Sequence, residues 1–183
     1  MENQGVWVSS SRPCMEMKNL FVFAVLFACG PVMTQGSLLE LQRMIKQVTG
    51  KNAIWNYSMY GCFCGWGGKG MPKDATDQCC RLHDCCYDRL SNNGCNAITD
   101  MYSYFYLSKT IYCGLGSWCE TQSCECDKKF VHCLKRHLGS YNKKYRFYRK
   151  RRCGTEKLSC SKFAEMLSLP NINVFAQGKS NKM

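Results

Sequence analysis

Cysteine constrains this chain more than any other residue, because 16 of its 183 residues are cysteines. Such a density is typical of a secreted protein held by disulfides, since cytosolic proteins keep their thiols reduced. Four of the cysteines lie in residues 79–87, which read CCRLHDCCY and enclose a histidine followed directly by an aspartate. Paired cysteines can also ligate zinc, but an oxidising compartment favours disulfides. The sequence therefore predicts a bridged scaffold around His83 and Asp84.

Residues 1–36 are predicted to be a leader and a secretory signal peptide. A short apolar run at 20–28 follows Lys18, and small residues precede a cleavage site that we expect after Gly36. The run is too short to span a membrane. Residues 1–16 are an unusual polar leader, and a later start of the chain is an equally good interpretation.

Cleavage after Gly36 would remove Cys14 and Cys29 and leave an even number of cysteines, which fits seven bridges. The formal charge is +12, and the removed segment carries equal numbers of acids and bases. A secreted protein with this charge is expected to seek anionic lipid head groups or heparin-like chains. Secretion argues against nucleic acid as the partner. We expect a soluble, extracellular monomer.

Hydrophobic spacing predicts a short amphipathic helix over residues 37–49, and two longer helices over about 72–90 and 119–137. Residues 100–113 predict two short strands. Cys79 and Cys86 lie seven residues apart, as do Cys126 and Cys133, and seven residues are two helical turns. If the long helices are antiparallel, 79 can meet 133 and 86 can meet 126, although other pairings remain open.

The histidine and aspartate at 83 and 84 cannot act on each other, because adjacent helical residues point about 100° apart. Residues 60–70 are rich in glycine, which suits a loop that approaches a ligand closely. Asp84 together with carbonyl groups of this loop would form an all-oxygen site that suits Ca²⁺. The loop could also be an ordinary glycine turn. His83 needs a carboxylate from elsewhere, and Asp127 becomes available if the helices are bridged.

These pieces together resemble a secreted phospholipase A2 of the group II type. The resemblance rests on residues 60–68 (YGCFCGWGG), 77–87 (DQCCRLHDCCY), 124–127 (CECD) and 141–145 (YNKKY). It covers residues 37–160 and leaves 161–183 as a tail that we expect to be flexible or weakly helical. The implied fold is mainly α, small and disulfide-rich, with an N-terminal helix, a calcium loop, two long antiparallel helices and a small β-wing.

The resemblance also implies roles for individual residues. His83 falls at the general base that takes a proton from the attacking water, and Asp127 falls at the carboxylate that orients it. Tyr87 and Tyr102 fall at tyrosines that hydrogen-bond this aspartate. The implied Ca²⁺ ligands are Asp84 and the backbone carbonyls of Phe63, Gly65 and Gly67. The implied disulfides are 62–153, 64–80, 79–133, 85–160, 86–126, 95–119 and 113–124.

The implied activity is calcium-dependent hydrolysis of the sn-2 ester of glycerophospholipids in membranes or micelles, with a preference for anionic surfaces. Its products are a fatty acid and a lysophospholipid. The rival hypothesis is a non-catalytic cationic protein on the same scaffold, which acts on bacteria, receptors or proteoglycans by charge alone. Family members that have lost activity commonly carry lysine in place of Asp84, so the aspartate here favours an enzyme.

Three further features have two interpretations each. The seven cations of residues 141–152 predict a site for anionic surfaces or heparan sulfate, or else a solvated face. Residues 37–49 either contact lipid together with Trp66 or pack the core, and we expect about half of the apolar stripe to be buried. Residues 56–58 (NYS) form a glycosylation sequon near the lipid-facing rim, whose occupancy the sequence leaves open. His132 and His137 are expected at the surface.

Overall fold

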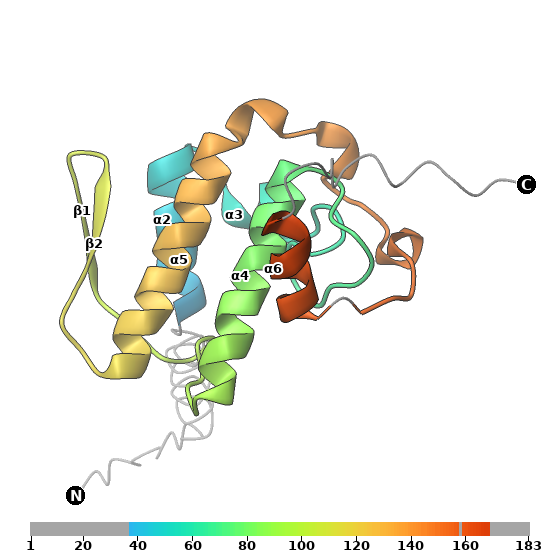
Figure 1. Cartoon of the computed structure of the whole chain (residues 1–183). Coiled ribbons are helices and arrows are strands. Elements are labelled where there is room, and N and C mark those ends of the chain that lie inside the picture. The colour runs from blue at the N-terminus through green and yellow to red at the C-terminus, as the bar shows by residue number, and fades with distance from the viewer. Residues whose placement is uncertain (1–36, 158, 169–183) are drawn as a thin grey trace, which may run out of the picture. The chain divides into compact units, whose positions relative to one another are not determined.

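The computed structural model describes residues 37–157 and 159–168 (Figure 1). The predicted leader, the signal peptide and the cleavage after Gly36 lie outside these residues. The described elements are α2 (Ser37–Thr49), α3 (Ala53–Tyr57), α4 (Ala75–Asn92), β1 (Tyr104–Leu107), β2 (Thr110–Cys113), α5 (Trp118–Arg136), the 3₁₀ turns η2 (Leu138–Ser140), η3 (Lys143–Tyr145) and η4 (Lys150–Cys153), and α6 (Cys160–Ser168).

The first predicted helix is α2, and it has the predicted bounds. Its side chains repeat at three and four residues, so one face turns inward. Leu41, Ile45 and Val48 are buried, whereas Leu38 is 46% exposed. The burial of three of these four residues exceeds the half that the sequence led us to expect. Helix α2 therefore both packs the core and presents an apolar residue at the surface.

The two long helices lie side by side and run in opposite directions (Figure 1). Asp74 caps the start of α4, where its side chain accepts a hydrogen bond from the Asp77 amide. Ser117 and Glu120 form a capping box at the start of α5. These caps fix where each helix begins, and therefore which residues share the face between them.

All seven predicted disulfides are present. Two of them, 79–133 and 86–126, join α4 to α5 two helical turns apart. Because the bridges use every cysteine from 62 to 160, these residues offer no thiolate for the alternative zinc sites.

Strands β1 and β2 form an antiparallel hairpin in which Leu107 pairs with Thr110. The two residues of the turn, Ser108 and Lys109, both have positive φ angles of 52° and 65°. Such angles belong to the tight turns that match the twist of a hairpin. The predicted β-wing is therefore confirmed as a two-residue hairpin without glycine.

The main core lies between α2, α5 and the segment that precedes α4. Its most buried members include Met44, Tyr60, Ile111, Val131 and Leu134. Three half-buried tyrosines from the chain after α5 pack against this cluster: Tyr141, Tyr145 and Tyr148. Burial of this kind stabilises a small domain by the removal of apolar surface from water, and the bridges add to it.

The tail after Cys160 was expected to be flexible or weakly helical, and the structure contains a helix at its start. Helix α6 lies beside α4, to which the Cys85–Cys160 disulfide ties it. Its Phe163 is only 1% exposed. Residues 169–183 lie outside the described part of the chain.

Among the described residues, no helix is both long enough and apolar enough to cross a membrane.

Candidate active site

His83 and Asp127 meet across the two long helices. The Nε2 atom of His83 lies 2.6 Å from Oδ1 of Asp127, whose side chain is fully buried. The two residues are 44 positions apart in the sequence. The 79–133 and 86–126 bridges hold the two helices in the register that brings these side chains together. The structure therefore brings together the two residues that the sequence predicted as base and orienting carboxylate.

Two tyrosines complete the surroundings of Asp127. The Tyr87 hydroxyl donates to Oδ1 at 2.7 Å, and the Tyr102 hydroxyl donates to Oδ2 at 2.5 Å. Burial, followed by the negative charge of Asp127, raises the pKa of both phenols well above the ordinary value. The phenols therefore remain protonated donors. A carboxylate is the form of Asp127 that accepts from both of them and from a His83 N–H.

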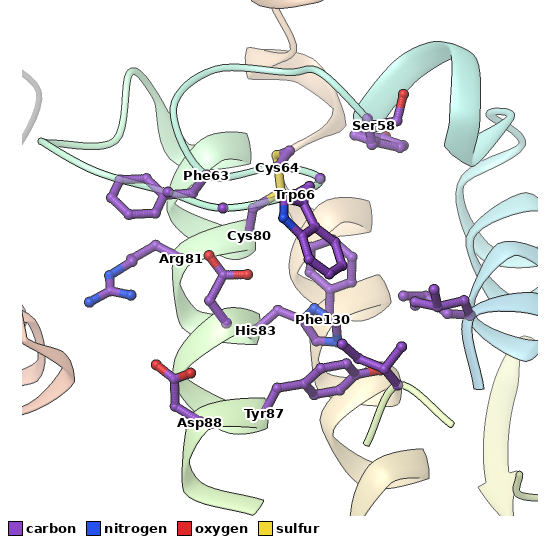
Figure 2. Close-up of a pocket in the computed structure, with 18 of the residues that line it drawn as sticks. Ser58, Phe63, Cys64, Trp66, Cys80, Arg81, His83, Tyr87, Asp88 and Phe130 are labelled. Carbon is purple, nitrogen blue, oxygen red and sulfur yellow. A yellow bond between two sulfur atoms is a disulfide. The ribbon is translucent and has the colours of Figure 1, made fainter. Parts of the chain in front are cut away.

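This network fixes the tautomer of His83. With Nε2–H donating to Asp127, Nδ1 carries the lone pair. The imidazole stacks on Phe130, with ring centroids 4.4 Å apart and an interplanar angle of 18°. It also contacts the Tyr87 ring, at a centroid distance of 4.2 Å. Figure 2 shows the three rings grouped beside α4. The ring is thus held in one orientation from two sides.

A cavity of about 1110 Å³ opens beside His83. Its walls come from α2, α3, the glycine-rich loop and α4, and they include Leu41, Ile45, Phe63 and Asp84. Much of this lining is apolar. The cavity is large enough to hold a drug-sized ligand, and its walls suit a hydrocarbon chain.

The glycine-rich loop has a conformation that depends on its glycines. Gly65 and Gly67 have φ angles of 86° and 67°, which are unfavourable for residues with side chains. A Cβ atom at Gly65 would lie 1.7 Å from the carbonyl oxygen of Ser58. Asp77 anchors the start of the loop, because its carboxylate accepts hydrogen bonds from the Cys62 and Phe63 amides at 2.7 and 2.8 Å.

Asp84 lines the same cavity as the loop residues Phe63, Gly65 and Gly67. No hydrogen bond or ion pair to its carboxylate is found among the described residues. Burial raises the pKa of this carboxyl to about 7, and electrostatic interactions with His83 and Arg81 act in the opposite direction. An inward-facing acid beside loop carbonyls is a set of hard oxygen donors. These residues could hold Ca²⁺.

Lys150 is a residue of this site that the sequence analysis missed. The sequence placed Lys150 in the basic run, the seven cations of residues 141–152. In the structure its Nζ atom donates to the carbonyls of Cys62 and Cys64 at 3.0 Å and of Gly67 at 3.3 Å. Burial lowers the pKa of this ammonium group, against the charges of Asp77 and Asp84. The sequence carries only one signal for this contact, which is that Lys150 lies three residues before Cys153.

Arg81 and Phe163 form a second contact that the sequence did not predict. The guanidinium of Arg81 lies over the Phe63 ring at 5.1 Å and over the Phe163 ring at 5.7 Å. Helix α6 therefore packs, through Arg81, against a residue of the glycine-rich loop. Contacts of a cation with aromatic faces are favourable when desolvated.

The basic run is divided between surface and interior. Arg146 donates to the Trp55 carbonyl at 2.7 Å, and Lys150 binds the loop. The remaining cations of the run are exposed: Lys143, Lys144, Arg149, Arg151 and Arg152. His132 and His137, which were expected at the surface, are half-buried.

Exposed apolar side chains lie in the wall of the cavity and on helix α3 beside it. Trp66 is 88% exposed, Trp55 63% and Ile54 54%. Trp66 and Ile54 also line the cavity. Tryptophan favours the boundary between water and lipid. The predicted role of Trp66 and of residues 37–49 at a lipid surface remains a prediction, and α3 adds residues that the sequence analysis did not name.

The chain is similar to known proteins over most of its described residues. A family profile described as phospholipase A2 matches residues 38–146. Human phospholipase A2 group V is 50% identical over 132 residues, which are 72% of this chain and 96% of that protein. Mouse group IID secretory phospholipase A2 is 51% identical over 136 residues, or 74% and 94% of the two chains. A basic phospholipase A2 of Craspedocephalus borneensis is 49% identical over 144 residues, or 79% and 100%.

Proposed function

Because this chain belongs to the phospholipase A2 family, as a secreted member of the group II type, we propose that it is a calcium-dependent enzyme that hydrolyses the sn-2 ester of glycerophospholipids. The observation that carries the proposal is the shared cavity of His83 and Asp84. His83 supplies a base whose ring is oriented by Asp127, and Asp84 supplies a carboxylate beside the loop carbonyls.

His83 acts as the general base. Its Nδ1 atom takes a proton from a water molecule in the cavity, and that water attacks the ester carbonyl. Asp127 and its two tyrosine donors keep Nε2 protonated and stabilise the imidazolium that forms. The proton then passes to the leaving alcohol. Because water is the nucleophile, no serine or cysteine nucleophile is needed.

Asp84 and the carbonyls of Phe63, Gly65 and Gly67 would hold Ca²⁺. When bound there, the ion supplies a positive charge for the ester oxygen and the phosphate. The loop contributes N–H donors in addition, and that of Gly65 is the candidate second donor to the developing oxyanion. The bend at Gly65 brings this backbone against Ser58, where a side chain would not fit.

The cavity and its rim favour a lipid substrate in an aggregate. An acyl chain can lie against Leu41 and Ile45, while Trp66 and Trp55 rest on the surface of the bilayer. The exposed cations among residues 143–152 would add attraction to anionic lipids. The same cations could bind heparan sulfate proteoglycans.

The rival hypothesis, a non-catalytic cationic protein, is supported by those exposed cations alone. It predicts binding to anionic surfaces without ester hydrolysis, and it gives no reason for a buried Asp127 with three donors. Charge by itself does not need an oriented imidazole.

The proposal is tested by fatty-acid release from phosphatidylglycerol vesicles. We expect release with calcium, none with a chelator, and none from the His83→Gln variant. Vesicle binding without release in the presence of calcium would favour the rival, as would killing of bacteria that survives His83→Gln.

A further inference from the structure

The short helix α3 carries a sequence that the proposed function does not use. Residues 56–58 are the one Asn-x-Ser/Thr triplet among the 183 residues. The sequon begins inside α3 and ends at its C-cap residue, Ser58. Seven disulfides place the chain in the secretory route, where such triplets are modified.

Helix α3 is anchored on one side and open on the other. Tyr57 is 4% exposed, and its ring packs edge-on against Tyr141 at a centroid distance of 5.7 Å. The Tyr141 hydroxyl donates to the Asn56 carbonyl at 2.8 Å. These contacts fix the orientation of the helix, and they leave Ile54 and Trp55 more than half exposed.

Asn56 is half-buried, and among the described residues its side-chain amide donates a single hydrogen bond. Its Nδ2 atom donates one hydrogen bond to the Asn52 carbonyl at 2.8 Å, at the exposed surface of the helix. A primary amide has two N–H groups, so the second remains for substitution while the first keeps its bond. The folded structure is therefore compatible with a modified Asn56.

We propose that Asn56 carries an N-linked glycan that controls how the exposed apolar side chains beside the cavity, Ile54, Trp55 and Trp66, dock onto membranes. In this reaction the amide nitrogen forms a bond to C1 of the first sugar of a lipid-linked oligosaccharide pyrophosphate. The bond from C1 to the pyrophosphate oxygen breaks, and the nitrogen loses one proton. The donor is the general one of the secretory pathway, so the chain supplies only the acceptor.

The position of Asn56 gives the glycan its effect. Its neighbours are Ile54, Trp55 and Met59, which are 54, 63 and 52% exposed, and Ile54 and Ser58 line the cavity. A large hydrophilic group among these side chains would keep them from entering a bilayer. Asn56 itself does not line the cavity, so a glycan on its side chain would leave the cavity open at His83.

The glycosylated protein should therefore retain its chemistry and lose membrane affinity. This consequence rests on the proposed phospholipase function, whereas the modification itself does not. The burial of even one large apolar side chain is worth about a tenfold change in partition or more. We expect the unglycosylated form to bind vesicles at least tenfold more tightly.

The test uses the full chain secreted from animal cells, beside Asn56→Gln and Ser58→Ala, which both destroy the triplet. Mass before and after digestion with a peptide-N-glycosidase reports the glycan. Binding to phosphatidylglycerol–phosphatidylcholine vesicles reports docking, and turnover of a monomeric short-chain phospholipid reports chemistry. Asn56→Gln is the neutral comparison, because the glycosidase leaves an aspartate.

We expect a digestible mass shift in the wild type alone, tighter vesicle binding by Asn56→Gln, and equal turnover of the monomeric lipid. Digestion of folded wild type gives a second unglycosylated sample that does not depend on folding of a variant. Absence of a mass shift would overturn the proposal, and so would equal vesicle binding with and without the glycan. Absence of turnover in every sample, with the mass shift present, would instead contradict the proposed function.

Discussion

The Oδ1 atom of Asp127 receives both the imidazole of His83, at 2.6 Å, and the hydroxyl of Tyr87, at 2.7 Å. Oδ1 of Asp127 thus links His83, whose ring would take a proton, to Tyr87, which lies one helical turn further along α4. The second oxygen is held by Tyr102. The carboxylate has little freedom to move, so the ring that it orients has little freedom either.

Replacement of this carboxylate should damage catalysis more than folding. In Asp127→Asn the amide can offer N–H to the imidazole, which favours the wrong tautomer and removes the charge that stabilises the imidazolium. We expect turnover of monomeric phospholipid to fall by about two to four orders of magnitude. A circular dichroism spectrum like that of the wild type serves as the control. Near-normal turnover would contradict the assigned role.

Lys150 should act as a positioning residue for the loop. Its ammonium group binds the carbonyls of Cys62 and Cys64, which alternate along the chain with those assigned to calcium, and at 3.3 Å the carbonyl of Gly67, which is one of the assigned ligands. Lys150→Met keeps the length of the side chain and removes these bonds, so we expect Ca²⁺ affinity measured by calorimetry to fall about tenfold, the equivalent of one or two hydrogen bonds.

The matched control for Lys150→Met is Lys144→Met, which removes an exposed cation of the same run. If Lys150 acted only by repelling the ion, its removal would tighten calcium binding instead. Tighter binding in Lys150→Met would therefore refute the positioning role.

Calcium binding should depend on pH through Asp84. The pKa of this group is raised to about 7 in the folded chain, from an ordinary value of 3.8. Without the ion, the folded state holds the extra proton, so stability from this group is present at low pH and is lost as pH rises from about 4 to 7. The proton and Ca²⁺ compete for the same carboxylate.

We therefore expect Ca²⁺ to raise the melting temperature more at pH 8 than at pH 5. Its affinity should fall by up to about tenfold for each pH unit below 7. Calorimetry at several pH values, with Asp84→Asn as the comparison, measures this. An affinity that is constant from pH 5 to 8 would exclude Asp84 as a ligand.

Helix α6 should contribute to stability through Phe163. This side chain is 1% exposed and packs against the guanidinium of Arg81. Phe163→Ala leaves a cavity, for which we expect a loss of about 3–5 kcal/mol in the free energy of unfolding, measured by chemical denaturation. Lys162→Ala alters an exposed neighbour and should change stability by less than about 0.5 kcal/mol. Equal effects of the two substitutions would mean that α6 does not pack as described.

Much of the fold follows from short-range pattern. The seven-residue spacing of Cys79 and Cys86, repeated at Cys126 and Cys133, showed that two antiparallel helices could be bridged twice, because helical periodicity is local. The caps and glycines that set the ends of α4 and α5 are equally local. The remaining bridges, the two tyrosines beside Asp127 and the individual loop ligands came from the resemblance to a family.

The contacts of Lys150 and Phe163 could not be predicted in this way. Each depends on the path that the chain takes after α5, where no period repeats and the turns are short 3₁₀ segments. A lysine in a basic run predicts a solvated charge, and only the return of Cys153 to Cys62 brings Lys150 against the loop. Phe163 likewise reaches Arg81 because Cys160 is tied to Cys85.

The measurement that tests the central claim most directly is calcium-dependent fatty-acid release from phosphatidylglycerol vesicles by the wild type and by Asp84→Lys, with Ca²⁺ binding to each followed by calorimetry. Our account predicts that the variant folds, binds no calcium and loses essentially all turnover. Turnover in the variant close to that of the wild type, or a wild type that hydrolyses lipid equally well in chelator, would contradict it.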